Sequence, residues 1–179
     1  MRKTSIAKKG KKTEGEKIKE AKSGKFAIIR VRGKVRVKSD IKDTMRLLKL
    51  TRVNHCVVVD DIPQIKGMIK KINDYVTWGE ISPESLEGLL QNKGELIGHK
   101  KLTDPYLKNN TNYSSIKDFV KAFFDNKTKI KDIPSLKPVF RLHPPRRGYE
   151  DKGIKKPFSI GGALGYRGSE INKLIEKMI

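Results

Sequence analysis

The sequence predicts an α+β fold whose central part has the element order β-α-β-α-β. Two observations carry this prediction. Three short runs rich in apolar, β-branched and aromatic residues, at 26–32, 56–59 and 75–78, alternate with two segments whose apolar residues recur at helical spacing. The pattern also changes near residues 25 and 81. We therefore expect a basic N-terminal arm over 1–24, a compact core over 25–81 and a mostly helical elaboration over 82–179.

The first strand and the first helix follow directly on the basic arm. The strand reads FAIIRVR and ends at Gly33, where the backbone can turn freely. Ser39 is the predicted cap of the helix, and Asp40 and Asp43 in its first turns favour the positive end of the helix dipole. We expect this helix to end near Leu50. Its predicted buried stripe consists of Ile41, Met45 and Leu48.

The apolar run at 56–59 predicts a second strand, which ends at two carboxylates, Asp60 and Asp61. Asp61 is the predicted cap of the following helix, and Pro63 suits its first turn. The two carboxylates are also a candidate Mg²⁺ site, although residues between a strand and a helix more often cap the helix. The predicted stripe of this helix consists of Ile65, Met68, Ile69 and Ile72. Residues 75–78 and Ile81 predict the third strand.

Three further helices are predicted in the elaboration. They begin near Ser82, Ser114 and Ser169, and apolar residues on one helical face follow each serine. Five prolines and a dense run of cations make regular structure improbable over 133–157. The predicted apolar faces are Leu86, Leu89 and Leu90, then Ile116, Phe119, Val120 and Phe123, then Ile171, Leu174, Ile175 and Met178.

The charge of the chain indicates a polyanionic partner. The 179 residues include 41 Lys and Arg against 20 Asp and Glu, so the formal net charge is +21. Self-repulsion opposes compaction unless a polyanion neutralises it, so nucleic acid is the favoured partner and an anionic membrane is the alternative. No stretch approaches the roughly 18 apolar residues of a spanning helix, and no apolar signal segment follows the basic N-terminus. We therefore expect a cytoplasmic protein.

The basic arm has its own composition. Residues 1–24 contain nine Lys or Arg and three Glu but almost no large apolar residue. Such a segment cannot bury enough apolar area to offset the entropy of ordering, so we expect it to be disordered. Its charge predicts that it binds RNA, and a solvated tail is the alternative. The arm accounts for +6 of the net charge, which leaves +15 on the part predicted to fold.

The sequence shows no motif of catalysis or metal binding. The single cysteine, Cys56, lies in the second strand, and neither it nor His55 has a partner at metal-ligand spacing. The stretch 161–168, GGALGYRG, does not match the nucleotide-binding patterns GxGxxG or GxxxxGK[ST]. Its glycines, beside Arg167, can instead approach an RNA backbone closely. Gly67 costs its helix about 1 kcal/mol, which close packing or a close RNA backbone would explain. We predict no enzyme activity, cofactor or metal.

The cations outside the arm form two groups. Arg or Lys occupies every second position from 30 to 38, so an extended chain would project all of them to one side. The second group lies in 141–156, a loop with prolines and glycines that phosphate contact explains better than folding. A solvated loop is the alternative, and Tyr149 and Tyr166 are candidates for stacking on unpaired bases. The predicted RNA-contacting residues are Arg30, Arg32, Lys34, Arg36, Lys38, Arg52, Arg141, Arg146, Arg147, Lys152, Lys155, Lys156 and Arg167.

Several spaced motifs resemble one known family. They are VRG at 31–33, TMRLLKL at 44–50, NHCVVVDD at 54–61, IKGMIKKI at 65–72, PPRRG at 144–148, the glycine pair at 161–162 and INKLI at 171–175. In this order they resemble the large-subunit ribosomal protein L-thirty family, whose eukaryotic members are called L-seven. The resemblance covers about residues 26–179 and is to the long archaeal and eukaryotic form, with an arm similar to archaeal members.

The resemblance implies a structural protein of the large ribosomal subunit with a ferredoxin-like core. Its implied partners are large-subunit rRNA, neighbouring ribosomal proteins and, as a second candidate, 5S rRNA. Two hypotheses of other classes stay open at this point: an RNA-modifying enzyme that holds a nucleotide-derived cofactor on the glycine stretch, and a non-ribosomal regulator that binds DNA. Affinity of the free protein for such a cofactor would favour the first, and equal affinity for duplex DNA and rRNA would favour the second.

Overall fold

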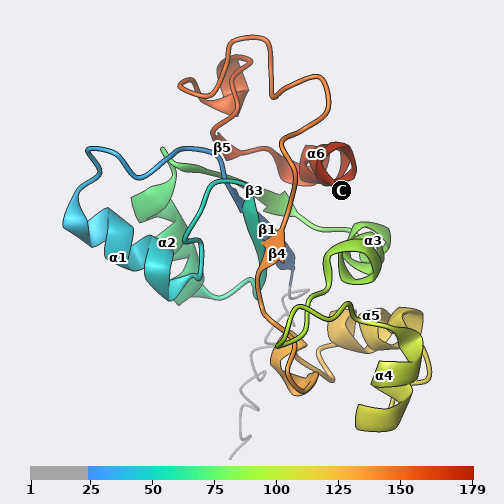
Figure 1. Ribbon diagram of the computed structural model, residues 1–179. Helices are drawn as coiled ribbons and strands as arrows, with labels where there is room; N and C mark the ends of the chain where they lie inside the picture. The colour runs from blue at the N-terminus through green and yellow to red at the C-terminus, as the bar shows by residue number, and fades with distance from the viewer. Residues whose placement is uncertain (1–23) are drawn as a thin grey trace, which may run out of the picture.

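A computed structural model describes residues 24–179 (Figure 1). The predicted disorder and RNA contact of the N-terminal arm therefore lie outside the described residues, apart from Gly24. From residue 25 to 80 the elements follow the order β1, α1, β2, α2, β3, which confirms the predicted β-α-β-α-β core. The division of the chain into a core and an elaboration at residue 81 stays an interpretation of the sequence.

The centre of the molecule is a five-stranded sheet with the order β4-β2-β1-β3-β5. β1 (Lys25–Arg30) pairs antiparallel with β2 (His55–Asp60) on one side and with β3 (Val76–Glu80) on the other. β4 (Phe140–Arg141) lies antiparallel to β2, and β5 (Gly165–Tyr166) lies parallel to β3. The elaboration therefore adds a short strand to each edge of the core sheet.

The sheet separates two helical layers (Figure 1). Because successive strand residues point to opposite faces, Ile28 packs on one side with α1 (Ser39–Leu47) and α2 (Pro63–Ile72). Ile29 packs on the other side with α3 (Pro83–Lys93), α5 (Ile116–Phe124) and α6 (Ile171–Met178). All of the apolar residues predicted for these five helices lie in one of these two clusters. Within the core, the sheet covered by α1 and α2 is consistent with the ferredoxin-like class that the resemblance implies.

The remaining elements of the elaboration are short. They are α4 (Asp104–Asn110) and the 3₁₀ turns η1 (Ile130–Asp132), η2 (Phe158–Ile160) and η3 (Gly168–Glu170). The prediction of no regular structure over 133–157 is wrong at β4. Phe140 is fully buried there and lies opposite Cys56, so one apolar side chain holds a short extended segment against β2.

Helix starts were harder to predict than helices. The prediction for α3 is confirmed, because the Ser82 hydroxyl accepts a hydrogen bond of 3.2 Å from the Ser85 N–H and Pro83 opens the helix. Ser39 and Asp61 are wrong as caps, since α1 and α2 begin after Lys38 and Ile62 without a side-chain cap. Three other predicted helix boundaries are shifted. The residue before α5 is Ser115 rather than Ser114, and the residue before α6 is Glu170 rather than Ser169. α1 ends at Leu47 rather than Leu50.

Candidate nucleic-acid interface

The cations that an extended chain would project to one side after β1 do not lie along a straight strand. β1 ends at Arg30, and the chain bends and turns between Gly33 and Arg36, where Arg36 has a φ of 54°. Val37 is buried in the cluster under α1, which pulls the chain back to the core. The alternation expected of an extended chain is therefore wrong, because this segment is a loop rather than a strand.

Arg30, one of the predicted RNA contacts, lies inside the protein. Its side chain is 3% exposed. The guanidinium donates to the carbonyl oxygens of Arg32 at 2.9 Å, Leu50 at 2.8 Å and Thr51 at 3.0 Å. Burial lowers the pKa of Arg30 from its usual value. Arg30 thus fastens the loop after α1 to the end of β1.

The other members of this group stay at the surface. Arg32 is half-buried, donates to the Asp74 carbonyl at 3.1 Å and lies 5.0 Å from the centre of the Tyr75 ring. Its side chain is therefore oriented by the protein at the rim of the loop. Four cations around it are exposed, and none of them forms an ion pair among residues 24–179. These are Lys34, Arg36, Lys38 and Arg52.

Three distant segments of the chain meet where β1 ends. Val31 packs with Ala163 and Leu164 in a small buried cluster. The Asn54 N–H donates to the Arg30 carbonyl at 2.8 Å, and the Tyr149 hydroxyl donates to the Asn54 side chain at 2.7 Å. In Figure 1 the 144–164 segment lies above this upper end of the sheet. The loop after β1, the turn at residues 51–54 and the basic loop of the elaboration are thus brought together.

The basic loop itself exposes its charged side chains. Its backbone is fixed to α6, because the N–H groups of His143 and Arg146 donate to the carbonyls of Met178 and Lys177 at 2.9 and 3.0 Å. Its cations are exposed and form no ion pair within residues 24–179. They are Arg146, Arg147, Lys152, Lys155 and Lys156.

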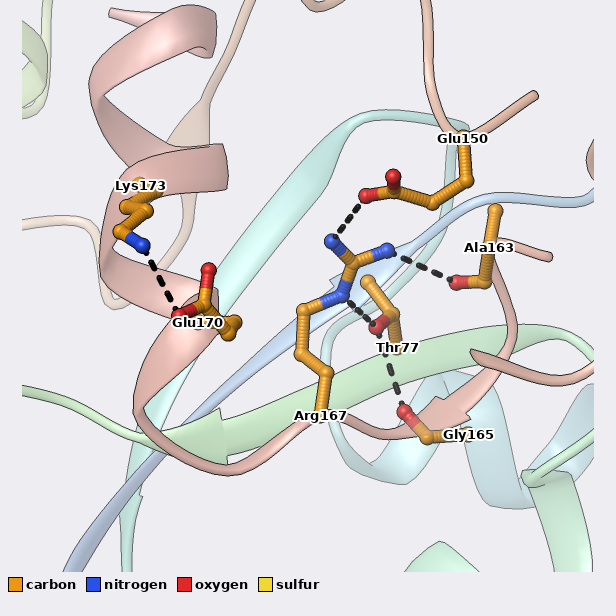
Figure 2. Close-up of polar contacts among 7 residues, drawn as sticks. All are labelled: Thr77, Glu150, Ala163, Gly165, Arg167, Glu170 and Lys173. Carbon is orange, nitrogen blue, oxygen red and sulfur yellow. Dashed lines mark hydrogen bonds and ion pairs between the residues drawn. The ribbon is translucent and has the colours of Figure 1, made fainter. Parts of the chain in front are cut away.

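Arg167, another of the predicted RNA contacts, is also buried (Figure 2). Its side chain meets the Glu150 carboxylate at 2.8 Å, the Thr77 hydroxyl at 3.0 Å and the Ala163 carbonyl at 3.4 Å. The guanidinium also lies 4.5 Å from the centre of the Phe158 ring. All of these partners belong to the protein, so Arg167 clamps the 150–164 segment onto β3.

The glycines of 161–168 likewise allow close packing within the protein. A Cβ at Gly162 would lie 2.1 Å from the Lys156 carbonyl oxygen, and Gly165 has a φ of +83° where β5 pairs with β3. The carbonyl oxygen of Gly168 lies so close to Gly79 that a Cβ added at Gly79 would be 2.0 Å from it. At the buried Gly162 and Gly165 the backbone path within the protein accounts for glycine without the predicted approach of an RNA backbone.

Arg141 is exposed but partly neutralised. Its guanidinium lies 3.6 Å from Glu95, which also accepts from Lys137 at 2.9 Å. The hydrogen bond from Lys137, followed by smaller effects that include the charge of Arg141, lowers the pKa of Glu95. Arg141 lies opposite His55 in the sheet, and burial, followed by the charges of Arg141 and Arg52, lowers the pKa of that imidazole. Arg141 therefore stands at the margin of the exposed cations.

The two tyrosines proposed for stacking differ. Tyr149 is half-buried, and burial raises its pKa to about 12, so its ring belongs to the frame under the basic loop. Tyr166 is 52% exposed and lies 4.7 Å from the Trp78 ring. Its hydroxyl donates to Glu80 at 2.6 Å, and this bond raises the pKa of Tyr166. Tyr166 alone of the two keeps a face open to a base.

Sequence reasoning missed Lys177. Its carbonyl accepts from Arg146, and its side chain is exposed beside the basic loop. The signal was present, because Lys177 lies off the apolar stripe of α6 that Ile171, Leu174, Ile175 and Met178 define. A helix whose apolar face is known also reveals which of its cations point outward.

The described residues give no support for a metal or a reactive thiol. No group of three or more His, Cys, Asp or Glu is clustered among residues 24–179. Asp60 and Asp61 pair with Lys25 and Lys66, so the candidate Mg²⁺ pair is divided between two lysines. Burial raises the pKa of the Cys56 thiol to about 12. Within the same range, no helix is long and apolar enough to cross a membrane.

The chain is similar to known proteins of one family. The family model described as "Ribosomal protein L30p/L7e" matches residues 26–76, from β1 to the first residue of β3. "Large ribosomal subunit protein uL30" of Methanopyrus kandleri is 54% identical over 149 residues, which cover 83% of this chain and 100% of the relative. The chain belongs to the uL30 family.

Other archaeal members give the same result. The uL30 proteins of Methanosphaera stadtmanae and Methanoregula boonei are 49% and 50% identical over 154 residues, which cover 86% of this chain and 99% of each relative. Because the core spans only residues 25–81, the similarity is not limited to the core and extends into the elaboration.

Proposed function

We propose that the protein is a structural constituent of the archaeal large ribosomal subunit that binds folded rRNA at the end of the sheet where β1 ends. One observation carries this proposal: loops from three parts of the chain converge there and present unpaired cations. We call this group the basic end surface. It consists of Arg32, Lys34, Arg36, Lys38, Arg52, Arg146, Arg147, Lys152, Lys155 and Lys156, with Arg141 at its margin.

The construction of this surface favours a shaped RNA over an arbitrary polyanion. Arg30 and Arg167 hold the underlying loops from inside, and Tyr149 ties the basic loop to Asn54. The exposed cations are therefore displayed on a fixed backbone. Phosphate contacts from such a frame read the path of a folded backbone, whereas a flexible tail would follow any duplex.

The salt dependence of rRNA binding tests the proposal. Replacing Arg146 and Arg147 together with Ala should lower the slope of log affinity against log salt by about two, because two phosphate contacts are lost. The measurement is a titration of labelled large-subunit rRNA from the same organism at several salt concentrations. Lys108→Ala with Lys121→Ala is the matched control, since these exposed lysines lie on α4 and α5. An unchanged slope in the Arg146 and Arg147 variant would remove the basic loop from the interface.

The basic end surface is also the basis for proposing specific partners. We propose large-subunit rRNA as the principal partner, with 5S rRNA as a second candidate and neighbouring ribosomal proteins around it. Stoichiometric co-sedimentation of the endogenous protein with the large subunit tests the assembly. Titration of isolated 5S rRNA beside a large-subunit rRNA fragment ranks the two RNAs. Equal affinity for duplex DNA at physiological salt would favour the regulator hypothesis instead.

A further inference from the structure

Gly67 lies in the middle of α2, and nothing in residues 24–179 explains a glycine there. A Cβ at this position would have no other heavy atom within 4 Å beyond the neighbouring helix backbone, and the residue is exposed. Glycine inside a helix costs about 1 kcal/mol relative to alanine. The packing explanation that the sequence left open is therefore excluded for the described residues.

At some other glycines of this protein, packing within the chain explains why a side chain cannot be present. A Cβ at Gly79, Gly94 or Gly162 would lie 2.0, 2.3 or 2.1 Å from a backbone oxygen of another segment or turn. At these positions no larger residue fits. Gly67 presents bare helix backbone to the outside instead, so no neighbour among residues 24–179 uses the close approach that glycine permits.

The surroundings of Gly67 are cationic. Lys70 and Lys71 follow it by three and four positions, so both lie on the same side of the helix one turn later. Both are exposed, and neither forms an ion pair among residues 24–179. Lys66 is also exposed and pairs with Asp61 at 2.7 Å. Apart from Pro63, the outward positions of α2 carry no apolar side chain, which disfavours an apolar protein partner.

This side of α2 also adjoins the basic end surface. α2 ends at Ile72, and the loop that follows accepts a hydrogen bond from Arg32 at the Asp74 carbonyl. The N–H groups of Val31 and Arg32 donate to the Tyr75 carbonyl at 3.0 and 3.1 Å. The end of α2 that carries Lys70 and Lys71 is thus joined directly to the loop after β1.

We propose that the outward side of α2 around Gly67 is a second rRNA contact. The RNA sugar-phosphate backbone lies directly against the helix backbone at Gly67, and Lys70 and Lys71 pair with its phosphates. The proposal rests on the proposed function, because it extends the same RNA beyond the basic end surface. A side chain at position 67 would hold that backbone away from the helix.

A single substitution separates this role from folding. Gly67→Ala should raise the melting temperature by about 2–4 °C, since alanine favours the helix and meets no neighbour. The same variant should bind labelled large-subunit rRNA about tenfold more weakly. Gly67→Gln should weaken binding further, because its side chain is longer. Loss of affinity in a more stable protein cannot be caused by unfolding.

Two controls match these variants. Gly88→Ala lies in α3, where the new Cβ would be 3.6 Å from Ile179, an ordinary contact, so it should stabilise similarly without changing rRNA affinity. Lys70→Ala with Lys71→Ala should lower the salt slope by about two, whereas Lys108→Ala with Lys121→Ala should leave it unchanged.

The outcomes distinguish this proposal from the proposed function. Wild-type rRNA affinity in Gly67→Ala would overturn the second contact and leave the basic end surface standing. Wild-type rRNA affinity combined with poor incorporation into the large subunit would assign position 67 to a protein neighbour and overturn it as well. If the wild-type protein itself does not bind folded rRNA, the proposed function fails first and this contact fails with it.

Discussion

Two stretches of the elaboration, 144–156 and 161–168, both contain arginine predicted to contact RNA, but they place it differently. Both combine arginine with glycine, and both carry residues that the sequence predicts as RNA contacts. The first exposes Arg146 and Arg147 to solvent, whereas the second buries Arg167 among protein acceptors. The difference teaches that the role of an arginine depends on the acceptors within reach of its guanidinium and not on the charge of its segment.

Glycine explains why the second stretch turns inward. Gly162, Gly165 and Gly168 allow the chain to pass within contact distance of Lys156 and β3. That close path brings Arg167 over Thr77 and opposite Glu150 (Figure 2). In the first stretch the backbone at Arg146 is fixed to α6, and the Arg146 and Arg147 side chains form no ion pair among residues 24–179 and are exposed to solvent.

Replacing Arg167 with Met should have the largest effect on stability. The substitution keeps the length of the side chain but leaves Thr77 and the half-exposed Glu150 without their partner. We expect a loss of about 3 kcal/mol in the free energy of unfolding, measured by urea denaturation. A stability equal to that of the wild type, together with weaker rRNA binding, would mean that Arg167 is a contact after all.

Arg30→Met should have the next largest effect. Three carbonyl oxygens lose a charged donor, one of them at the buried Leu50. We expect a loss of about 2 kcal/mol in the free energy of unfolding, because each buried acceptor loses its hydrogen bond. Urea denaturation measures this loss, and exposed Arg36→Met is the matched control that should change stability little.

Tyr149→Phe should cost about 1 kcal/mol at neutral pH, because the hydrogen bond to Asn54 is lost. The variant also predicts a pH effect. Burial raises the pKa of Tyr149 to about 12, above the value of about 10 in the unfolded chain. This tyrosine therefore contributes stability that is present below pH 10 and is lost as the pH rises towards 12. Denaturation between these values should show a flatter decline in Tyr149→Phe than in the wild type.

Arg146→Ala with Arg147→Ala should have the smallest effect on stability, within about 0.5 kcal/mol, because both side chains are exposed and unpaired among the described residues. Its effect should appear in rRNA binding instead. A thermal melt beside the salt titration measures both properties on one sample. A marked loss of melting temperature would show that the basic loop supports the fold as Arg167 does.

Much of the fold could be predicted because it depends on local pattern. The stripe of Ile65, Ile69 and Ile72 has helical spacing, and the short apolar run at 56–59 is typical of a buried strand. β4 escaped prediction because a two-residue strand has no period of its own. Only the edge of β2 and a pocket for Phe140 make it regular.

The amino-acid sequence alone was enough to predict the α+β order of the core, its apolar faces and an excess of positive charge that favours a polyanionic partner. Only the tertiary structure decided which cations are exposed and which are buried. Arg30 and Arg167 are turned inward by carbonyl, carboxylate and hydroxyl groups contributed from residues 2 to 90 positions away in the chain. Gly67 shows the converse, since only the structure reveals that no neighbour among residues 24–179 accounts for a glycine there. Most of the acceptors that hold Arg30 and Arg167 are far away in the sequence, and no local pattern of residue types encodes them.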